Sequence, residues 1–258
     1  MAKYTAKYLS PDQVAQPSRG WGLLMLAVSA IIPELVLHLS TAQGSATLFN
    51  TGLFLPALFA MVPVLAVFAV MWFIPSKGVN LGILIAHAAF WLLLCGSQLV
   101  YYKIFGCFYS AYSMANGGEA FQFWNTIMVS FLRNLPWLIA MLLPMLCVCI
   151  FGHKLLPQGK PKRSIHGLIP LAAAVALQVL LVLSLPLMGG KAAMSPYDLY
   201  HHTGDTYYSV NKLGLAPAFR LDITRLITGD TGGGTIQIPT TTAPQETTVP
   251  PTTEDTRG

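Results

Sequence analysis

Five long apolar segments alternate with short polar ones over the first 190 residues. Each apolar segment has about the 20 residues that a helix needs to cross a hydrocarbon core about 30 Å thick. Their apolar character is too uniform for amphipathic helices on the surface of a soluble protein. The pattern predicts transmembrane helices at residues 21–40, 51–74, 81–102, about 131–151 and 166–188.

The polar segments that flank these spans predict the topology. Positive charges gather before span one, between spans two and three, and between spans four and five: Lys3, Lys7, Arg19, Lys77, Lys154, Lys160, Lys162 and Arg163. With five spans, all three segments fall on one side of the membrane, and an excess of Lys and Arg marks the cytoplasmic side. We therefore predict a cytoplasmic N-terminus at 1–20, a five-helix transmembrane domain at 21–190 and an extracellular C-terminus.

The segment that follows span five, residues 191–229, is predicted to be an extracellular juxtamembrane segment. Four of its apolar residues recur at the spacing of one helix face: Phe219, Ile223, Leu226 and Ile227. Pro217 suits the first turn of a helix and Gly229 suits its end. The pattern predicts an amphipathic helix at about 217–228.

The last part of the chain, residues 230–258, has a different composition. Its final 20 residues contain eight Thr, four Pro and no aromatic residue. Such a segment cannot bury enough apolar surface to fold, and proline keeps it extended. We predict a disordered Thr/Pro-rich linker.

Overall composition agrees with the spans. Hydrophobic residues make up 54% of the chain and charged residues 10%, against about 25% charged residues in soluble domains. The net charge of +5 is concentrated in the segments that set the topology, so we expect no nucleic-acid partner. The predicted fold class is an all-α membrane protein with five transmembrane helices.

Two stretches resemble a known family. YYKIFGCFYSAYSMANGGEAFQFW (101–124) is similar to the exit of span three and the outer loop of clostridial members of the lipoteichoic acid synthase family, which belongs to the alkaline phosphatase/sulfatase superfamily. SVNKLGLAPAFRLDITRLITG (209–229) is similar to the element and helix that follow span five there. The resemblance covers essentially residues 20–229.

The resemblance implies a multi-pass protein of a bacterial plasma membrane that anchors an extracellular phosphoglycerol transferase acting on phosphatidylglycerol. Family members carry a nucleophilic threonine and a divalent metal, usually manganese, in a large extracellular domain. No position of this sequence matches the nucleophile or the metal ligands, so no catalytic, cofactor-binding or metal residue is assigned. We expect the catalytic domain to follow residue 258 as the partner of this membrane region.

Ionisable residues in or beside the spans are the candidate site residues, because an uncompensated charge in a bilayer is costly. We expect five residues near the outer boundary to contact a lipid head group or the growing polymer: Glu34, His38, Lys103, Glu119 and Arg133. Glu34 and His38 lie four apart on one helix face. An alternative is that these two pair with each other or with another helix, and that Lys103 and Arg133 extend to the interface.

Other functions stay open at this point. Within the superfamily, the chain could anchor a sulfatase or a phosphoethanolamine transferase, since one metal site serves several reactions. Outside it, the chain could be a small polytopic membrane protein in its own right, such as a transporter component or an assembly partner. The spacing in DLYHHTGD (198–205) could bind zinc, although adjacent histidines in a loop more often face solvent.

Overall fold

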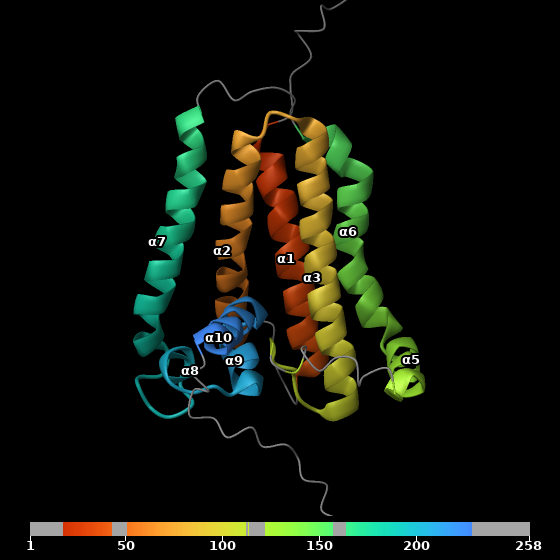
Figure 1. The fold of residues 1–258 in the computed structure, drawn as a ribbon, viewed down its shortest axis with the longest axis vertical. Helices are drawn as coiled ribbons and strands as arrows, with labels where there is room; N and C mark the ends of the chain where they lie inside the picture. The colour runs from red at the N-terminus through yellow and green to blue at the C-terminus, as the bar shows by residue number, and fades with distance from the viewer. Residues whose placement is uncertain (1–17, 43–50, 112, 114–121, 157–163, 229–258) are drawn as a thin grey trace, which may run out of the picture.

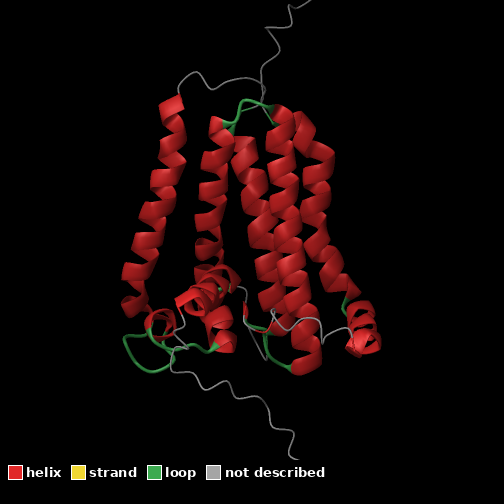
Figure 2. Ribbon diagram, viewed as in Figure 1, coloured by secondary structure: helices red, strands yellow, loops and turns green. Residues whose placement is uncertain are grey.

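The computed structural model describes residues 18–42, 51–111, 113, 122–156 and 164–228. Glu119, the Thr/Pro-rich tail and most of the N-terminal segment lie outside these residues. Regular secondary structure in the described residues is helical, without a strand (Figure 2). Five of the helices are long and apolar enough to cross a membrane. The prediction of an all-α fold with five helices able to cross a membrane is therefore confirmed for the described residues.

The five long helices form an irregular bundle (Figure 1). They are α1 (Gly20–Thr41), α2 (Thr51–Phe73), α3 (Lys77–Phe105), α6 (Leu135–Leu155) and α7 (Leu168–Ser184). The short 3-10 helices η3 (Ser164–Gly167) and η4 (Leu185–Met188) flank α7. Helix α1 packs against α2, α3 and α6, whereas α7 packs against α2. The core therefore lies around α1, and α7 lies at the edge.

Helix α3 is longer than predicted because both of its ends are capped. The Ser76 side chain accepts a hydrogen bond from the Val79 backbone N–H at one end. Gly106 at the other end has φ 72°, and its N–H donates to the Tyr102 carbonyl. Ser at the N-cap and a left-handed glycine after the last turn are the residues that satisfy helix termini. Hydropathy alone does not report such caps.

The fourth predicted span begins too early. Residues from 131 belong in part to a separate helix, α5 (Trp124–Arg133), and the span itself starts at Leu135. Pro136 stands in the first turn of α6, where its missing N–H costs no hydrogen bond. Asn134 ends α5 and its side chain donates to the Ser130 carbonyl. An apolar run thus conceals a break between two helices.

Prolines behave in two ways. Pro33, Pro56, Pro63 and Pro144 lie inside spanning helices, as the sequence predicts for a membrane bundle. Pro170 lies instead in the first turn of α7. A first-turn proline fits a helix start because its fixed φ is already helical.

Three short helices gather at one end of the bundle, and we call α8–α10 the juxtamembrane unit. They are α8 (Pro196–His201), α9 (Thr206–Leu213) and α10 (Leu215–Thr228). Helix α9 packs against α2 and α10, and α10 also contacts α2 (Figure 1). Leu213, Leu215 and Ala218 are buried there. The unit is thus packed onto the transmembrane helices.

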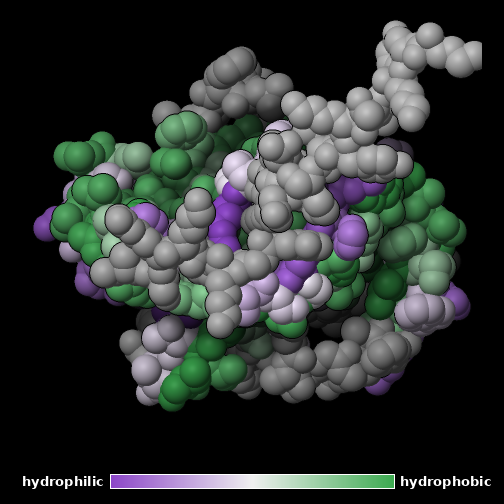
Figure 3. All heavy atoms as spheres, turned by 90° about the horizontal axis from the view of Figure 1, so that it is seen from above, coloured by the Kyte–Doolittle hydropathy of each residue, from purple (hydrophilic) through white to green (hydrophobic). Residues whose placement is uncertain are grey.

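The opposite end holds the N-terminal start of α1 and the connection from α2 to α3 (Figure 1). Viewed from that end, hydrophilic residues gather near the centre and hydrophobic residues occupy much of the rim (Figure 3). Large apolar side chains are exposed along the sides of the helices, among them Leu93, Ile169 and Leu183. Exposed apolar side chains around a bundle are what contact with lipid requires.

Candidate functional site

A buried polar contact joins α1 to the juxtamembrane unit. Glu34 is fully buried, and its Oε1 accepts a hydrogen bond of 2.6 Å from the Leu215 backbone N–H. Leu215 is the first residue of α10, so the carboxylate satisfies one of the free N–H groups at that helix start. The hydrogen bond to Glu34 thus attaches the start of α10 to α1, the helix at the centre of the bundle.

His38 makes the second contact from the same face of α1. Its Nδ1 lies 2.9 Å from the Glu34 backbone carbonyl oxygen, and its Nε2 lies 3.0 Å from the carbonyl oxygen of Val210 in α9. One contact stays within α1 and the other reaches α9, so the ring links these two helices through backbone carbonyl groups. His38 Nδ1 also lies 3.9 Å from Oε1 of Glu34.

Gly214 makes this approach possible. It connects α9 to α10 with φ 101° and ψ 168°, a conformation that is essentially restricted to glycine. A Cβ placed there would lie 2.8 Å from the Cα of Pro56 and 2.9 Å from Oε1 of Glu34. The turn therefore fits between α1 and α2 only without a side chain.

The other predicted site residues are distributed along the same end. Lys103 donates through Nζ to the carbonyl oxygen of Ser40 at 2.6 Å, which satisfies the last turn of α1. Arg133 is exposed at the end of α5 and, among the described residues, has no hydrogen bond or ion pair. Glu119 lies outside the described residues. The structure thus brings Glu34 and His38 together, places Lys103 at the end of their helix, and leaves Arg133 apart on α5.

A second link joins α10 to the loop after α3. Asp222 Oδ2 accepts from the Ala111 backbone N–H at 3.3 Å and from Thr206 Oγ1 at 3.5 Å. Burial raises the pKa of the Asp222 carboxyl above its usual value, and the hydrogen bond from Ala111 and the nearby Arg225 oppose the shift. The carboxylate is therefore held in place at an electrostatic cost.

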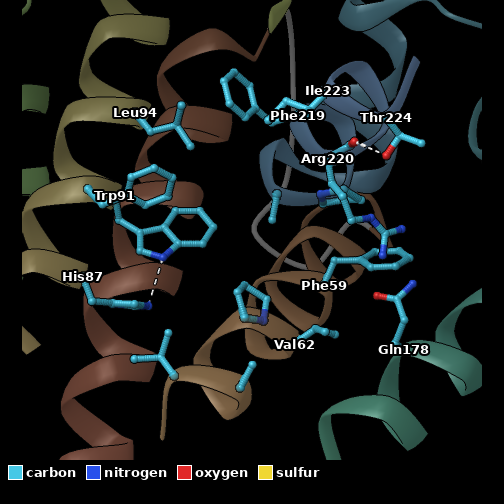
Figure 4. A pocket seen from close by; sticks show the side chains of 16 residues that line it. Phe59, Val62, His87, Trp91, Leu94, Gln178, Phe219, Arg220, Ile223 and Thr224 are labelled. Carbon is cyan, nitrogen blue, oxygen red and sulfur yellow. Dashed lines mark hydrogen bonds between the residues drawn. The ribbon is translucent and has the colours of Figure 1, made fainter. Parts of the chain in front are cut away.

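A cavity of about 470 Å³ lies against α10, and we call it the α10 groove (Figure 4). Its walls come from α2, α3 and α10, with Gln178 of α7 at the edge. Most of the lining is apolar: Phe59, Val62, Pro63, Ala66, Val67, Phe90, Leu94, Ala216, Pro217, Phe219 and Ile223. Its volume is in the range of about 300–1,000 Å³ that small-molecule sites occupy.

Helices α8 and α9 were missed in the sequence prediction, although each has a readable start. Ser195 accepts from the Asp198 N–H, and Asp205 accepts from the Tyr208 N–H, so both are N-caps. Ser before Pro196 and Asp before a Thr-Tyr-Tyr run are recognisable helix-start signals. They were not found because both helices are too short to show a clear apolar period.

The possible zinc spacing in 198–205 has another role in the structure. Asp198 Oδ2 accepts from Thr203 Oγ1 at 2.6 Å and from the Met194 N–H at 3.0 Å. These hydrogen bonds hold the pKa of the Asp198 carboxyl below its usual value. No three His, Cys, Asp or Glu side chains come close enough to hold a metal in the described part of the chain. Asp205 caps the start of α9, and Asp198 holds the segments on both sides of α8 through these two hydrogen bonds.

No protein-family model, no curated protein and no solved structure matches the chain. Function is therefore inferred from the residues and their geometry.

Proposed function

We propose that this chain is the membrane region of an extracellular phosphoglycerol transferase that resembles lipoteichoic acid synthases. The observation that carries the proposal is the docked juxtamembrane unit. A unit held by Glu34 and His38 gives whatever follows α10 a fixed starting point at the membrane surface. The choice of reaction is based on the resemblance of residues 101–124 and 209–229 to the lipoteichoic acid synthase family.

Anchoring contributes to this reaction by proximity. The reaction joins an acceptor hydroxyl to the phosphorus of phosphatidylglycerol and releases diacylglycerol, so both the substrate and one product stay in the bilayer. Holding the reacting groups at the leaflet raises their effective concentration. The proposal places the nucleophilic threonine and its divalent metal, manganese in the family, in a domain outside residues 1–258.

The distribution of charge supports the proposed orientation. Arg19 precedes α1, Lys77 begins α3 and Lys154 lies in the last turn of α6. These helix ends lie at the end of the bundle away from the juxtamembrane unit (Figure 1). The positive-inside rule makes that end cytoplasmic. The N-terminus is then cytoplasmic and the juxtamembrane unit is outside a bacterial plasma membrane.

The test has two stages. The coding sequence is first read in frame beyond Gly258, where we expect several hundred codons with a threonine-and-metal site. The complete product is then placed in vesicles of phosphatidylglycerol with Mn²⁺, and release of diacylglycerol is measured. A stop codon after Gly258 would overturn the anchor proposal.

The choice of lipid separates the related activities. Release of diacylglycerol from phosphatidylethanolamine alone would replace the proposal by a phosphoethanolamine transferase. Hydrolysis of a sulfate ester with no lipid turnover would replace it by a sulfatase. Equal activity without the membrane region would show that anchoring adds nothing to the reaction.

A further inference from the structure

The α10 groove differs from an ordinary gap between helices because its two ends have opposite chemistry. Its inner part lies between α2 and α3, at the level of residues such as Val67 and His87 in the middle of those spans. Its outer part lies under α10, where Arg220 and Thr224 line it. A groove that is apolar at the depth of the hydrocarbon core and cationic at the surface matches an amphiphile rather than a water-soluble ligand.

The polar groups in the inner part are already satisfied. Trp91 Nε1 donates to His87 Nε2 at 3.2 Å, as Figure 4 shows. The other ring nitrogen of His87 lies 3.3 Å from Ser29 Oγ, which itself donates to the Leu26 carbonyl. His87 thus uses both nitrogens within the protein and offers none to a ligand. What remains for an occupant is apolar contact.

The mouth of the groove presents a cation. The Arg220 guanidinium donates to the Tyr200 hydroxyl and lies over its ring, with 5.5 Å from Cζ to the ring centroid. Gln178 also donates to the Tyr200 hydroxyl, at 3.0 Å. Figure 4 shows Arg220 extending from α10 toward Phe59 and Gln178. Tyr200 therefore holds the guanidinium in position without neutralising it.

No carboxylate compensates this charge in the described part of the chain. The ion pair found there joins His38 to Glu34 and does not involve Arg220. Guanidinium binds phosphate through paired, charge-assisted hydrogen bonds. An exposed arginine at a membrane surface, beside an apolar groove, is therefore complementary to the phosphate of a lipid whose acyl chain enters the groove.

We infer that the α10 groove binds one acyl chain of an anionic phospholipid, with Arg220 contacting the lipid phosphate. The site belongs to the membrane region itself and needs no catalytic domain. It is also separate from the contacts of Glu34 and His38, which are used to hold the juxtamembrane unit. The bound lipid would lie against α10, so occupancy of the groove would stabilise the position of that helix.

The first experiment tests the groove. The full chain is purified in detergent with equal amounts of phosphatidylglycerol and phosphatidylcholine of identical chains, and retained lipid is counted by native mass spectrometry. Ala66→Phe fills the groove from α2 and should reduce retained phosphatidylglycerol about tenfold. Val70→Phe is the matched control, because Val70 lies one turn further on the same helix, is 54% exposed and does not line the groove. Equal retention by the two variants would overturn the inference.

The second experiment tests the cation. Arg220→Ala should remove the preference for phosphatidylglycerol over phosphatidylcholine, a loss of about tenfold. Arg220 is exposed, so this variant should keep the fold, and its melting temperature checks this. Arg220→Lys should keep part of the preference. Lys154→Gln removes the same charge from an exposed residue at the other end of the bundle and should change nothing.

Three further results would contradict the inference. Wild-type protein that retains both lipids equally would show only general contact with lipid. An unchanged preference in Arg220→Ala would place the phosphate elsewhere. If Lys154→Gln also lost the preference for phosphatidylglycerol, the preference would depend on the net charge of the protein and not on Arg220. None of these results depends on enzymatic turnover, so failure here leaves the proposed transferase function open, and failure of the transferase assay leaves the lipid site open.

Discussion

Helices α1 and α7 are both apolar and long enough to cross a membrane, but they have different surroundings. Half of the most apolar part of α1 is buried inside the protein, whereas only 17% of the most apolar part of α7 is buried. Helix α1 contacts three other spans and carries Glu34, His38 and Ser29, whereas α7 exposes large apolar residues such as Leu180 and Leu183. Hydropathy finds both helices, but the polar residues distinguish the one that organises the fold.

The largest effect is expected where α1, α2 and the juxtamembrane unit meet. Gly214→Ala should lower the free energy of unfolding by about 3–5 kcal/mol, because the new Cβ meets backbone in a conformation open only to glycine. Thermal unfolding in detergent measures it. Gly82→Ala is the control, since a Cβ on Gly82 meets nothing within 4 Å; alanine in that helix should be neutral or stabilising. Similar losses of stability in both variants would contradict the claim that the α9–α10 turn specifically requires glycine.

Loss of the hydrogen bond between Glu34 and Leu215 is expected to have the next largest effect on the free energy of unfolding. Glu34→Ala should cost about 1–3 kcal/mol, because the buried Leu215 N–H loses its acceptor. Glu34→Gln keeps a carbonyl oxygen and should cost less than half as much. Hydrogen exchange at the Leu215 amide reports the contact directly, and it should accelerate in Glu34→Ala. An unchanged exchange rate would mean that packing alone holds α10.

Asp222 tests a docking contact that does not involve α1. Its pKa is raised in the folded state, so its contribution favours folding below the ordinary value of 3.8 and is lost as the pH rises through the raised value. Asp222→Asn should therefore gain stability relative to the wild type as the pH rises through the acid range. Melting temperatures of the two proteins between pH 3 and pH 7 measure this. A constant difference across that range would contradict the burial of an ionised carboxylate.

The smallest effect is expected on α7. Leu180 is 64% exposed on a helix that contacts α2. Leu180→Ala should change the free energy of unfolding by less than about 0.5 kcal/mol. Unfolding in the same detergent measures it, with buried Leu26→Ala in α1 as the contrast at about 2–5 kcal/mol. If Leu180→Ala matched Leu26→Ala, α7 would have a covered face and the comparison of the two helices would fail.

The five spans could be predicted because each needs only a long apolar run, and the bilayer sets its length. Their ends depended on local signals that hydropathy does not contain, such as the Ser76 cap, the Gly106 turn and the break before Pro136. The i, i+4 spacing of Glu34 and His38 correctly placed both on one face. Their partners could not be predicted, because they are the backbone N–H of Leu215 and the carbonyl of Val210. Backbone groups have no sequence signature, and only the folded chain brings them within reach.

The distance along the chain between Glu34 and Leu215 also has a consequence for biosynthesis. The two residues are 181 positions apart, and at about 5–20 residues per second the ribosome needs about 10–40 s to reach the second after the first. During that interval the Glu34 carboxyl lacks the hydrogen bond that it later accepts from α10, and a polar group left without a partner inside a bilayer is costly. Docking of α10 therefore waits until α10 has been synthesised, and a nascent chain stopped before that point keeps an intramembrane acid without this hydrogen bond, which membrane quality control can recognise.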